Sequence, residues 1–254
     1  MFDIFDRPVI LFAIMAILLV AVARLGARLS RHYPVDQDMR QDFNILLGAV
    51  LTLLALMIGF SFSLASGRYD QRKNLEEAEA NAIGTEFARA DLLPATDGAK
   101  VRQLLRSYVE QRIEFYQAGS EAALAPINAR TTKLQAEMWA AVLPAAAASP
   151  TPITALAVSG MNDVLNSQGF SQAAWWNRIP ASAWGLILVI AVCANFLGGY
   201  GAHSIVAAKR LLFIFPLFIA VTLGFIADID SPRHGVIRVQ PQNLISLQGS
   251  LPAS

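Results

Sequence analysis

The stretch GFSFSLASGRYDQR, Gly59 to Arg72, passes from an uncharged apolar segment into a dense set of charges with no proline or polar turn between them. The apolar run that it ends begins at Ile45 and extends to Gly67. At 1.5 Å per residue such a run is long enough to cross a hydrocarbon core of about 30 Å. The stretch therefore predicts one helix that crosses the membrane and continues, without turning, into a polar region.

The composition is that of a membrane protein. Hydrophobic residues make up 55% of the chain and charged residues only 15%, and the apolar residues are grouped in blocks. The blocks are Pro8–Ala23, Ile45–Gly67, Ile179–Ala208 and Leu211–Ala227. The second and third exceed the usual span of about 20 residues, while the first and fourth are close to the lower limit of about 17. Four transmembrane helices are predicted.

The first apolar block has an alternative interpretation as a cleaved signal peptide. Ala21-Val22-Ala23 resembles a small-residue cleavage site. The residues before the block, however, include Asp3 and Asp6 beside Arg7, whereas a signal peptide needs a basic leader. We therefore expect a retained first span.

The polar region 68–178 has the pattern of a helical bundle. Residues at three- and four-residue spacing, from Leu75 to Phe87, give the first helix one buried stripe. The predicted helices are 68–92, 96–119 and 120–143, and Pro126 either kinks the third or marks its true start. A linker over 144–152 and a helix over 151–168 follow. The chain is accordingly divided into membrane helices 1 and 2 (1–67), the helical domain (68–178), membrane helices 3 and 4 (179–227) and a C-terminal tail (228–254). The fold class is an all-α membrane protein.

Enzymatic motifs are missing from the sequence. The three histidines, His32, His203 and His234, are scattered, and no phosphate loop or catalytic elbow is present. Cys193 is the only cysteine and lies inside the third apolar block, so it predicts neither a disulfide framework nor a metal site. The glycine cluster 198–201 is more typical of close helix packing than of a nucleotide loop. The net charge of +1 comes from mixed charges and predicts no nucleic-acid partner.

A pore is compatible with these spans, whereas an ion-coupled carrier is not favoured, because no charged residue lies in the middle of a span. A pore needs small polar groups, apolar constrictions and charges at its mouths. Thr52, Leu56, Phe60, Ser63 and Gly67 follow one another at three- and four-residue spacing and share one helix face. The alternative is that this face only packs against another helix.

The same helix resembles a known family. Gly59-Phe60 followed by Arg68-Tyr69 is similar to the second transmembrane helix of the bestrophin anion channels. The segments RYDQRKNLEEAEANAIGTEFARADLLP (68–94) and DIDSPRHGVIRVQPQNL (228–244) resemble the bacterial bestrophin-like membrane family more closely, and this likeness extends over most of the chain.

The resemblance implies a homopentamer of four-span subunits whose second helices line a central pore and run on into a cytosolic helical domain. It places the narrow apolar neck on Thr52, Leu56 and Phe60, although Thr52 departs from the apolar pattern. Arg68 and Arg72 would then ring the inner mouth and attract small anions, with Asp70, Glu76, Glu77 and Glu79 offsetting their charge. Basic residues near the span ends are almost evenly divided, so only the resemblance places both termini in the cytosol.

Asp228 and Asp230 stand where many bestrophins have an acidic calcium clasp. Calcium prefers six to eight oxygen ligands, and these two carboxylates alone supply too few. The alternative is that they pair with Arg233 or Arg238, or cap the turn at Ser231-Pro232. Calcium is the only cofactor that the resemblance brings forward.

The hypothesis from the sequence is therefore an oligomeric anion channel of the bacterial inner membrane, embedded in the lipid bilayer through several spans. The alternative function is a non-conducting membrane scaffold or sensor whose helical domain binds a partner. An enzyme is the least favoured class.

Overall fold

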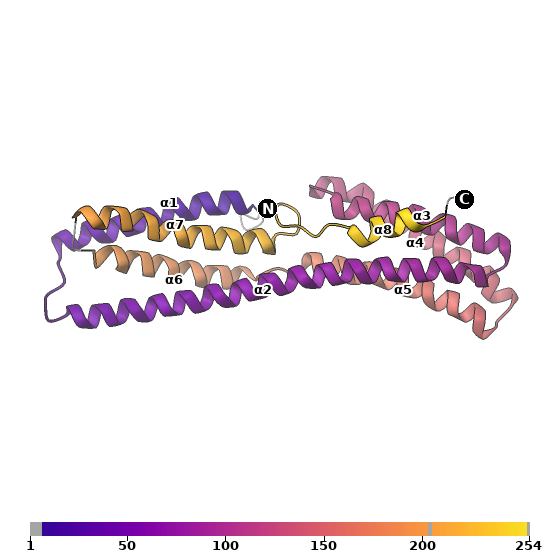
Figure 1. Cartoon of the computed structure of the whole chain (residues 1–254), viewed down its shortest axis with the longest axis horizontal. Helices are drawn as coiled ribbons and strands as arrows, with labels where there is room; N and C mark the ends of the chain where they lie inside the picture. The colour runs from indigo at the N-terminus through magenta and orange to yellow at the C-terminus, as the bar shows by residue number, and fades with distance from the viewer. Residues whose placement is uncertain (1–6, 203–204, 253–254) are drawn as a thin grey trace. The chain divides into compact units, whose positions relative to one another are not determined.

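The computed structural model describes residues 7–202 and 205–252, and this part of the chain contains helices and no strand. His203, and the acidic residues Asp3 and Asp6, lie outside the described residues. The all-helical prediction is confirmed (Figure 1). In chain order the elements are α1 (Pro8–His32), α2 (Arg40–Arg89), the short 3₁₀ helix η2 (Ala90–Leu92), α3 (Ala95–Gln117), α4 (Glu121–Ala148), α5 (Pro152–Trp176), α6 (Ala181–Tyr200), α7 (Ile205–Asp230) and α8 (Gln242–Ser250).

The chain divides into two compact units, and α2 contributes to both. One unit contains residues 1–68 and 178–238, and we call it the membrane unit. The other contains residues 69–177 and 239–254, and we call it the helical unit. The segment after residue 238 thus belongs to the helical unit rather than forming a separate tail.

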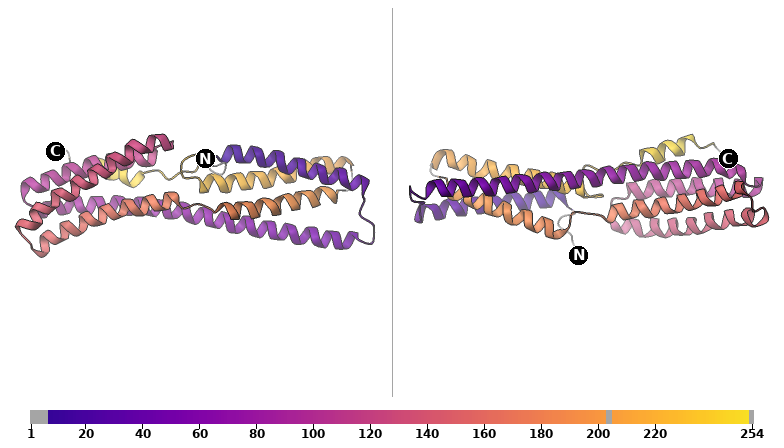
Figure 2. Two further views of the ribbon diagram at one scale, coloured as in Figure 1. Left: turned by 180° about the vertical axis from the view of Figure 1, so that it is seen from behind. Right: turned by 90° about the horizontal axis from the view of Figure 1, so that it is seen from below.

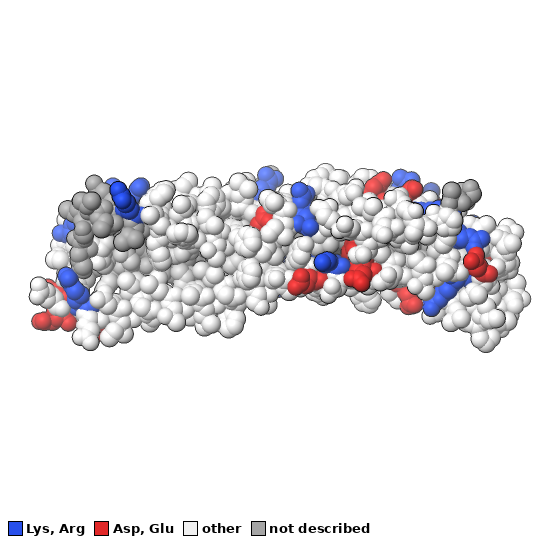
Figure 3. Space-filling view, viewed as in Figure 1, with Lys and Arg blue, Asp and Glu red and all other residues white. Residues whose placement is uncertain are grey.

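The membrane unit holds helices long and apolar enough to cross a bilayer. Within the described ranges, 7–202 and 205–252, there are four candidate spans, in segments that include α1, the first half of α2, α6 and α7. In Figure 3 the visible surface of this unit is white along most of its length, with charged side chains gathered toward its ends. A polar group exposed to hydrocarbon costs free energy, so this uncharged band is what a membrane-embedded surface requires. The chain is a multi-pass membrane protein.

Helix α1 is part of the core of the membrane unit. It packs along both α6 and α7, as the views of Figures 1 and 2 agree. Leu11, Leu19 and Ala23 of α1 are buried there.

Glycines allow α1 and α6 to approach closely. A Cβ added at Gly199 would lie only 2.0 Å from the carbonyl oxygen of Ala23, and one added at Gly26 would lie 2.2 Å from that of Phe196. The packing interpretation of the glycine cluster is therefore confirmed at Gly199. It does not extend to the neighbouring Gly198, whose Cβ would meet no atom within 4 Å.

Several predicted helix ends were wrong. Helix α6 ends at Tyr200 and α7 begins at Ile205, so the third apolar block is not one long span, and its last residues belong to the next helix. Helix α4 passes through Pro144 to Ala148. Val142 and Ala145, on either side of Pro144, are buried in the core of the helical unit, and this packing holds the helix together despite the hydrogen bond that proline removes. Helix α5 extends past Gln168 to Trp176.

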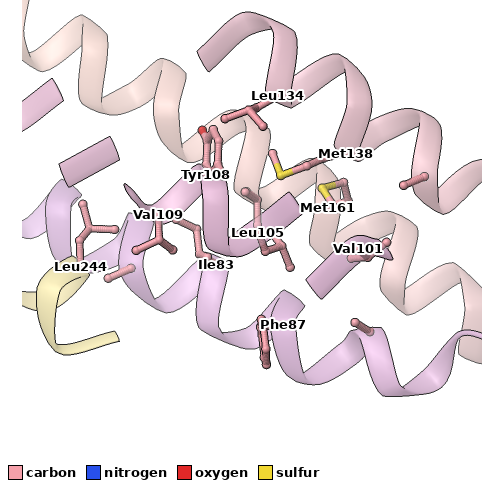
Figure 4. Close-up of a cluster of buried hydrophobic side chains, with 14 of the residues drawn as sticks. Ile83, Phe87, Val101, Leu105, Tyr108, Val109, Leu134, Met138, Met161 and Leu244 are labelled. Carbon is pink, nitrogen blue, oxygen red and sulfur yellow. The ribbon is translucent and has the colours of Figure 1, made fainter. Parts of the chain in front are cut away.

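The helical unit has a continuous apolar core. Side chains from five helices point toward one another in Figure 4, among them Ile83 of α2, Leu105 of α3, Met138 of α4, Met161 of α5 and Leu244 of α8. Each is fully buried. Because α8 contributes Leu244 to this core, the C-terminal helix is part of the unit's packing.

We expect Gly199→Ala to destabilise the membrane unit, because its new methyl group overlaps the α1 backbone. Overpacking of this kind costs about 1–3 kcal/mol. Thermal unfolding of the purified protein in detergent measures the loss, and Gly198→Ala is the matched control, expected to unfold close to the wild-type temperature. Equal unfolding temperatures for the two variants would contradict the close α1–α6 approach.

Candidate functional site

The membrane half of α2 packs through one face. Leu54, Ser61 and Ala65 are buried there, at seven- and four-residue spacing. The Ser61 hydroxyl donates to the carbonyl of Met57 at 2.8 Å, so this buried polar group is satisfied within its own helix. Phe62, beside this face, stacks on Phe225 of α7, with ring centroids 6.2 Å apart. This face anchors α2 to the other spans.

The predicted pore face lies on the other side of α2. Leu56 is 51% exposed and Phe60 is 58% exposed, although both are large apolar residues. Thr52 and Ser63 are also exposed. At about 100° per residue, these positions point away from Leu54, Ser61 and Ala65. The face is therefore not buried against the rest of this chain, so packing within the subunit does not explain it.

Arg68 and Arg72 lie on the packing side of α2. The Arg68 guanidinium is 3.4 Å from the carboxylate of Asp230. Arg72 is only 2% exposed. Its Nε donates to the carbonyl of Ala174 at 3.2 Å and its Nη2 to that of Asn177 at 3.1 Å. Arg72 thus satisfies carbonyls at the end of α5 that have no partner within the helix. These positions differ from the exposed ring that the resemblance implies.

Asp228 and Asp230 both accept hydrogen bonds from the backbone. Asp230 accepts from the Ile179 N–H at 3.0 Å, in addition to its ion pair with Arg68. Asp228 accepts from the N–H groups of Val236 and Ile237, at 2.7 and 2.9 Å, and so holds the turn after α7. No group of three or more His, Cys, Asp or Glu residues suited to a metal occurs in the described residues. Asp228 thus holds the turn after α7, close to the capping role that the sequence analysis named as an alternative, whereas Asp230 pairs with Arg68 and accepts from the backbone before α6, which was not predicted.

Buried carboxylates on α2 were missed by the sequence analysis, which treated Glu76 and Glu79 as charges offsetting the arginines. Glu76 accepts from the backbone N–H of Leu244 at 2.9 Å and from the Asn243 side chain at 2.6 Å. It therefore caps the N-terminus of α8 from another helix, where a negative charge is favourable. Their spacing could have predicted this burial, because Glu76, Glu79 and Glu86 lie on the same helix face as the buried Ile83.

Glu79 is the centre of a buried polar network in the helical unit. It forms an ion pair with Arg112, and neither side chain is exposed. The hydroxyls of Tyr116 and Ser171 each donate to it at 3.1 Å. The Arg112 guanidinium also lies over the ring of Phe115, at 4.3 Å from its centroid. These contacts join α2, α3 and α5, and the network raises the pKa of Tyr116 through burial and the adjacent Glu79 charge.

Glu86 is the one buried carboxylate of α2 that has no hydrogen-bond partner in the described part of the chain. It belongs to the helical unit, well beyond the apolar run, and lies against Gly160 of α5, where a Cβ would be 2.1 Å from its Oε2. Burial raises its pKa to about 8; nearby Arg89 lowers it and Asp163 raises it. At neutral pH the side chain is therefore mostly a neutral acid.

The comparisons with known proteins agree with this architecture. The model of the Bestrophin-like domain matches residues 16–244. The chain belongs to the Bestrophin-like family. No curated protein sequence matches it.

Solved structures share the fold. The structure of a bacterial bestrophin homolog from Klebsiella pneumoniae is 14% identical, with a TM-score of 0.63 over 96% of this chain and 100% of that chain. A single-site variant of the same homolog is 13% identical, with a TM-score of 0.64 over 93% of this chain and 98% of that one. At this identity the likeness establishes the bestrophin fold of the subunit.

We expect Arg72→Ala to destabilise the helical unit, because it leaves the buried carbonyl of Ala174 without this donor and removes a second, partly buried hydrogen bond to Asn177. An unsatisfied buried polar group costs about 1–3 kcal/mol. Chemical unfolding in detergent measures this loss. Lys73→Ala removes an adjacent but exposed cation and is expected to change the stability by less than about 0.5 kcal/mol. An equally small effect of both substitutions would contradict the packing role of Arg72.

We expect Glu86 to make the helical unit less stable as the pH rises. Its pKa in the folded state, about 8, lies above the ordinary value of 4.5, so folding favours the protonated acid. This contribution is fully present below pH 4.5 and is lost as the pH rises to 8. Glu86→Gln removes this dependence, while Glu110→Gln, at an exposed site, retains it. Parallel stability curves for wild type and Glu86→Gln between pH 5 and 8 would contradict the assignment.

Proposed function

We propose that this protein is an oligomeric ion channel in which the first half of α2 from each subunit lines a central pore. The observation that carries the proposal is the exposed face with Leu56 and Phe60 on a helix whose opposite face anchors it to its own subunit. Membership of the Bestrophin-like family supports the same assignment.

Assembly into a ring is required by the proposal, because one helix per subunit cannot enclose a pore. Most soluble homo-oligomers have closed point-group symmetry. We extend this rule to the membrane: in a cyclic ring, every subunit presents the same face to one axis. We take the number of subunits to be five, as the family resemblance implies. The ring would lie in the bacterial inner membrane, with the helical unit and both termini in the cytosol.

Leu56 and Phe60 form the proposed constriction. They lie one helical turn apart, so a ring of subunits would stack two apolar layers along the axis. Narrow apolar layers gate ion flow by excluding water. Thr52, the polar member of the predicted neck, precedes these two apolar layers and Ser63 follows them, and both are exposed. The Thr52 hydroxyl donates to the Gly48 carbonyl at 2.9 Å, which satisfies this polar group in its own helix.

The anion preference in the sequence analysis depended on Arg68 and Arg72 as exposed cations at the mouth of the pore. In the subunit both guanidinium groups have partners on the packing side of α2. The proposal of a channel does not depend on them, and the choice of ion follows from the charges that stay exposed.

We expect Phe60→Ala to increase ionic current several-fold, because it removes the larger apolar group from the neck and lets water enter. The measurement is current through planar bilayers containing purified protein in symmetric potassium chloride. Phe62→Ala is the matched control, since its ring stacks on Phe225 and faces away from the proposed axis. Absence of current from wild type and Phe60→Ala, or a monomeric particle in detergent, would favour the scaffold function instead.

A further inference from the structure

We propose that α1 binds an anionic phospholipid through its exposed arginines, Arg24, Arg28 and Arg31, which we call the arginine ladder. The proposal concerns the membrane unit alone and does not depend on the proposed pore. It follows from the alignment of the exposed residues of α1, the length of its uncharged segment and the contacts of its arginines.

The exposed side of α1 changes from apolar to basic along one line. Ile10, Ile14 and Ile17 are exposed, although they are large apolar residues. Ala21 and then the arginine ladder continue the same alternation of four- and three-residue steps, and all of them are exposed. At about 100° per residue, these positions point away from the buried Leu19. The line therefore lies on the side of α1 opposite to its packing against α6 and α7.

The uncharged segment of α1 is short for a span. The 16 residues Pro8–Ala23 carry no charge, and they are bounded by Arg7 and Arg24. Their helical rise is about 24 Å, whereas the hydrocarbon core of a bilayer is about 30 Å thick. Tilting the helix would shorten its reach further. A span of this length brings Arg24 to the edge of the hydrocarbon, where a charge is costly without a partner of opposite sign.

Tyrosines mark the level of the headgroups at this end of α1. Tyr33 directly follows the helix and is 70% exposed, and the hydroxyl of Tyr200 in α6 donates to its carbonyl oxygen. Tyrosine is enriched at the membrane surface, where its ring is in apolar and its hydroxyl in polar surroundings. At 1.5 Å per residue, the arginine ladder lies about 3 to 14 Å below Tyr33 along the helix. It therefore extends from the headgroups to the edge of the hydrocarbon.

The arginine ladder has no carboxylate partner in the described part of the chain, where none of its side chains forms an ion pair. The acidic residues that follow it most closely are Asp36 and Asp38, which are exposed in the connection to α2, after Tyr33. At the start of α2, Arg40 and Asp42 are opposite in charge. The positive charge of the ladder is thus left available for a ligand.

An anionic phospholipid fits both parts of this line. The planar guanidinium groups bind phosphate oxygens in pairs, and the exposed isoleucines offer an apolar surface to the acyl chains. A small soluble phosphate could use the arginines alone. A zwitterionic lipid carries its own cation beside the phosphate and gains less from the ladder. Charge and shape together therefore favour a phospholipid with a net negative charge.

The test is native mass spectrometry of the full-length protein in detergent micelles that contain equal amounts of phosphatidylglycerol and phosphatidylcholine. We expect the wild type to retain phosphatidylglycerol preferentially. Each arginine near the membrane surface contributes about five-fold to such binding, so the triple substitution Arg24→Gln, Arg28→Gln and Arg31→Gln should weaken it at least about tenfold. Arg130→Gln removes an exposed arginine of α4 in the helical unit and is the matched control, expected to bind like the wild type.

Glycerol phosphate in excess is the second arm of the test, and we expect it to leave the lipid bound. Displacement of the lipid by glycerol phosphate would identify a soluble phosphate as the ligand and overturn the lipid assignment. Equal binding of the two lipids, or equal binding by the wild type and the triple variant, would overturn the proposal.

The oligomeric state separates the lipid from a second copy of the chain. Dissociation of the oligomer in the triple variant, with lipid binding unchanged, would assign the arginine ladder to a contact between copies and overturn the proposal. Should the triple variant fail to fold, the single substitution Arg24→Gln keeps the test valid. It is expected to weaken phosphatidylglycerol binding about five-fold, and binding equal to that of Arg130→Gln would contradict the proposal.

Discussion

The structure depends on the compensation of charges along the packing side of α2. This helix serves as a wall of both units, and its inward-facing side carries Arg68, Arg72, Glu76 and Glu79. Removing one partner of a buried charge costs several kcal/mol. Arg68 pairs with a carboxylate, and Arg72 donates to two carbonyls. Glu76 caps the N-terminus of α8, and Glu79 pairs with a buried arginine. These contacts fix the rotation of α2 about its own axis. They therefore also determine which residues lie on its opposite face.

That fixed rotation gives the exposed face its meaning. Leu56 and Phe60 face outward because Leu54, Ser61 and Ala65 take the inward positions, and not because the subunit lacks a place for apolar groups. Scattered exposed apolar residues are normal on a membrane surface. A regular line of them that shares a helix face with the hydroxyls of Thr52 and Ser63 is a less ordinary surface for lipid, and it is the face that the proposed pore would use.

Sequence reasoning found the helices and missed the contacts that orient them. Long apolar blocks are sufficient to predict spans, and the unbroken passage through Gly59 to Arg72 was sufficient to predict that α2 continues. The end predicted at Pro144 was wrong because Val142 and Ala145 are buried in the core, and this packing outweighs one lost hydrogen bond. The ion pair of Glu79 joins residues far apart in sequence, on α2 and α3, so no local spacing could reveal it. The resemblance assigned roles to residues of α2. It gave no information on which arginine forms contacts inside the subunit.

The difference between buried and exposed positions on α2 also decides how its charges should be counted. The sequence around the end of the apolar run contains nearly equal numbers of acidic and basic residues, and a linear count favours neither ion. The charge of Arg68 is offset by the carboxylate of Asp230, and Glu79 pairs with Arg112, whereas Arg72 donates to neutral carbonyl groups, which do not cancel its charge. Which charges of α2 stay exposed is therefore decided by the packing of its inward-facing side, and a count along the sequence does not show it.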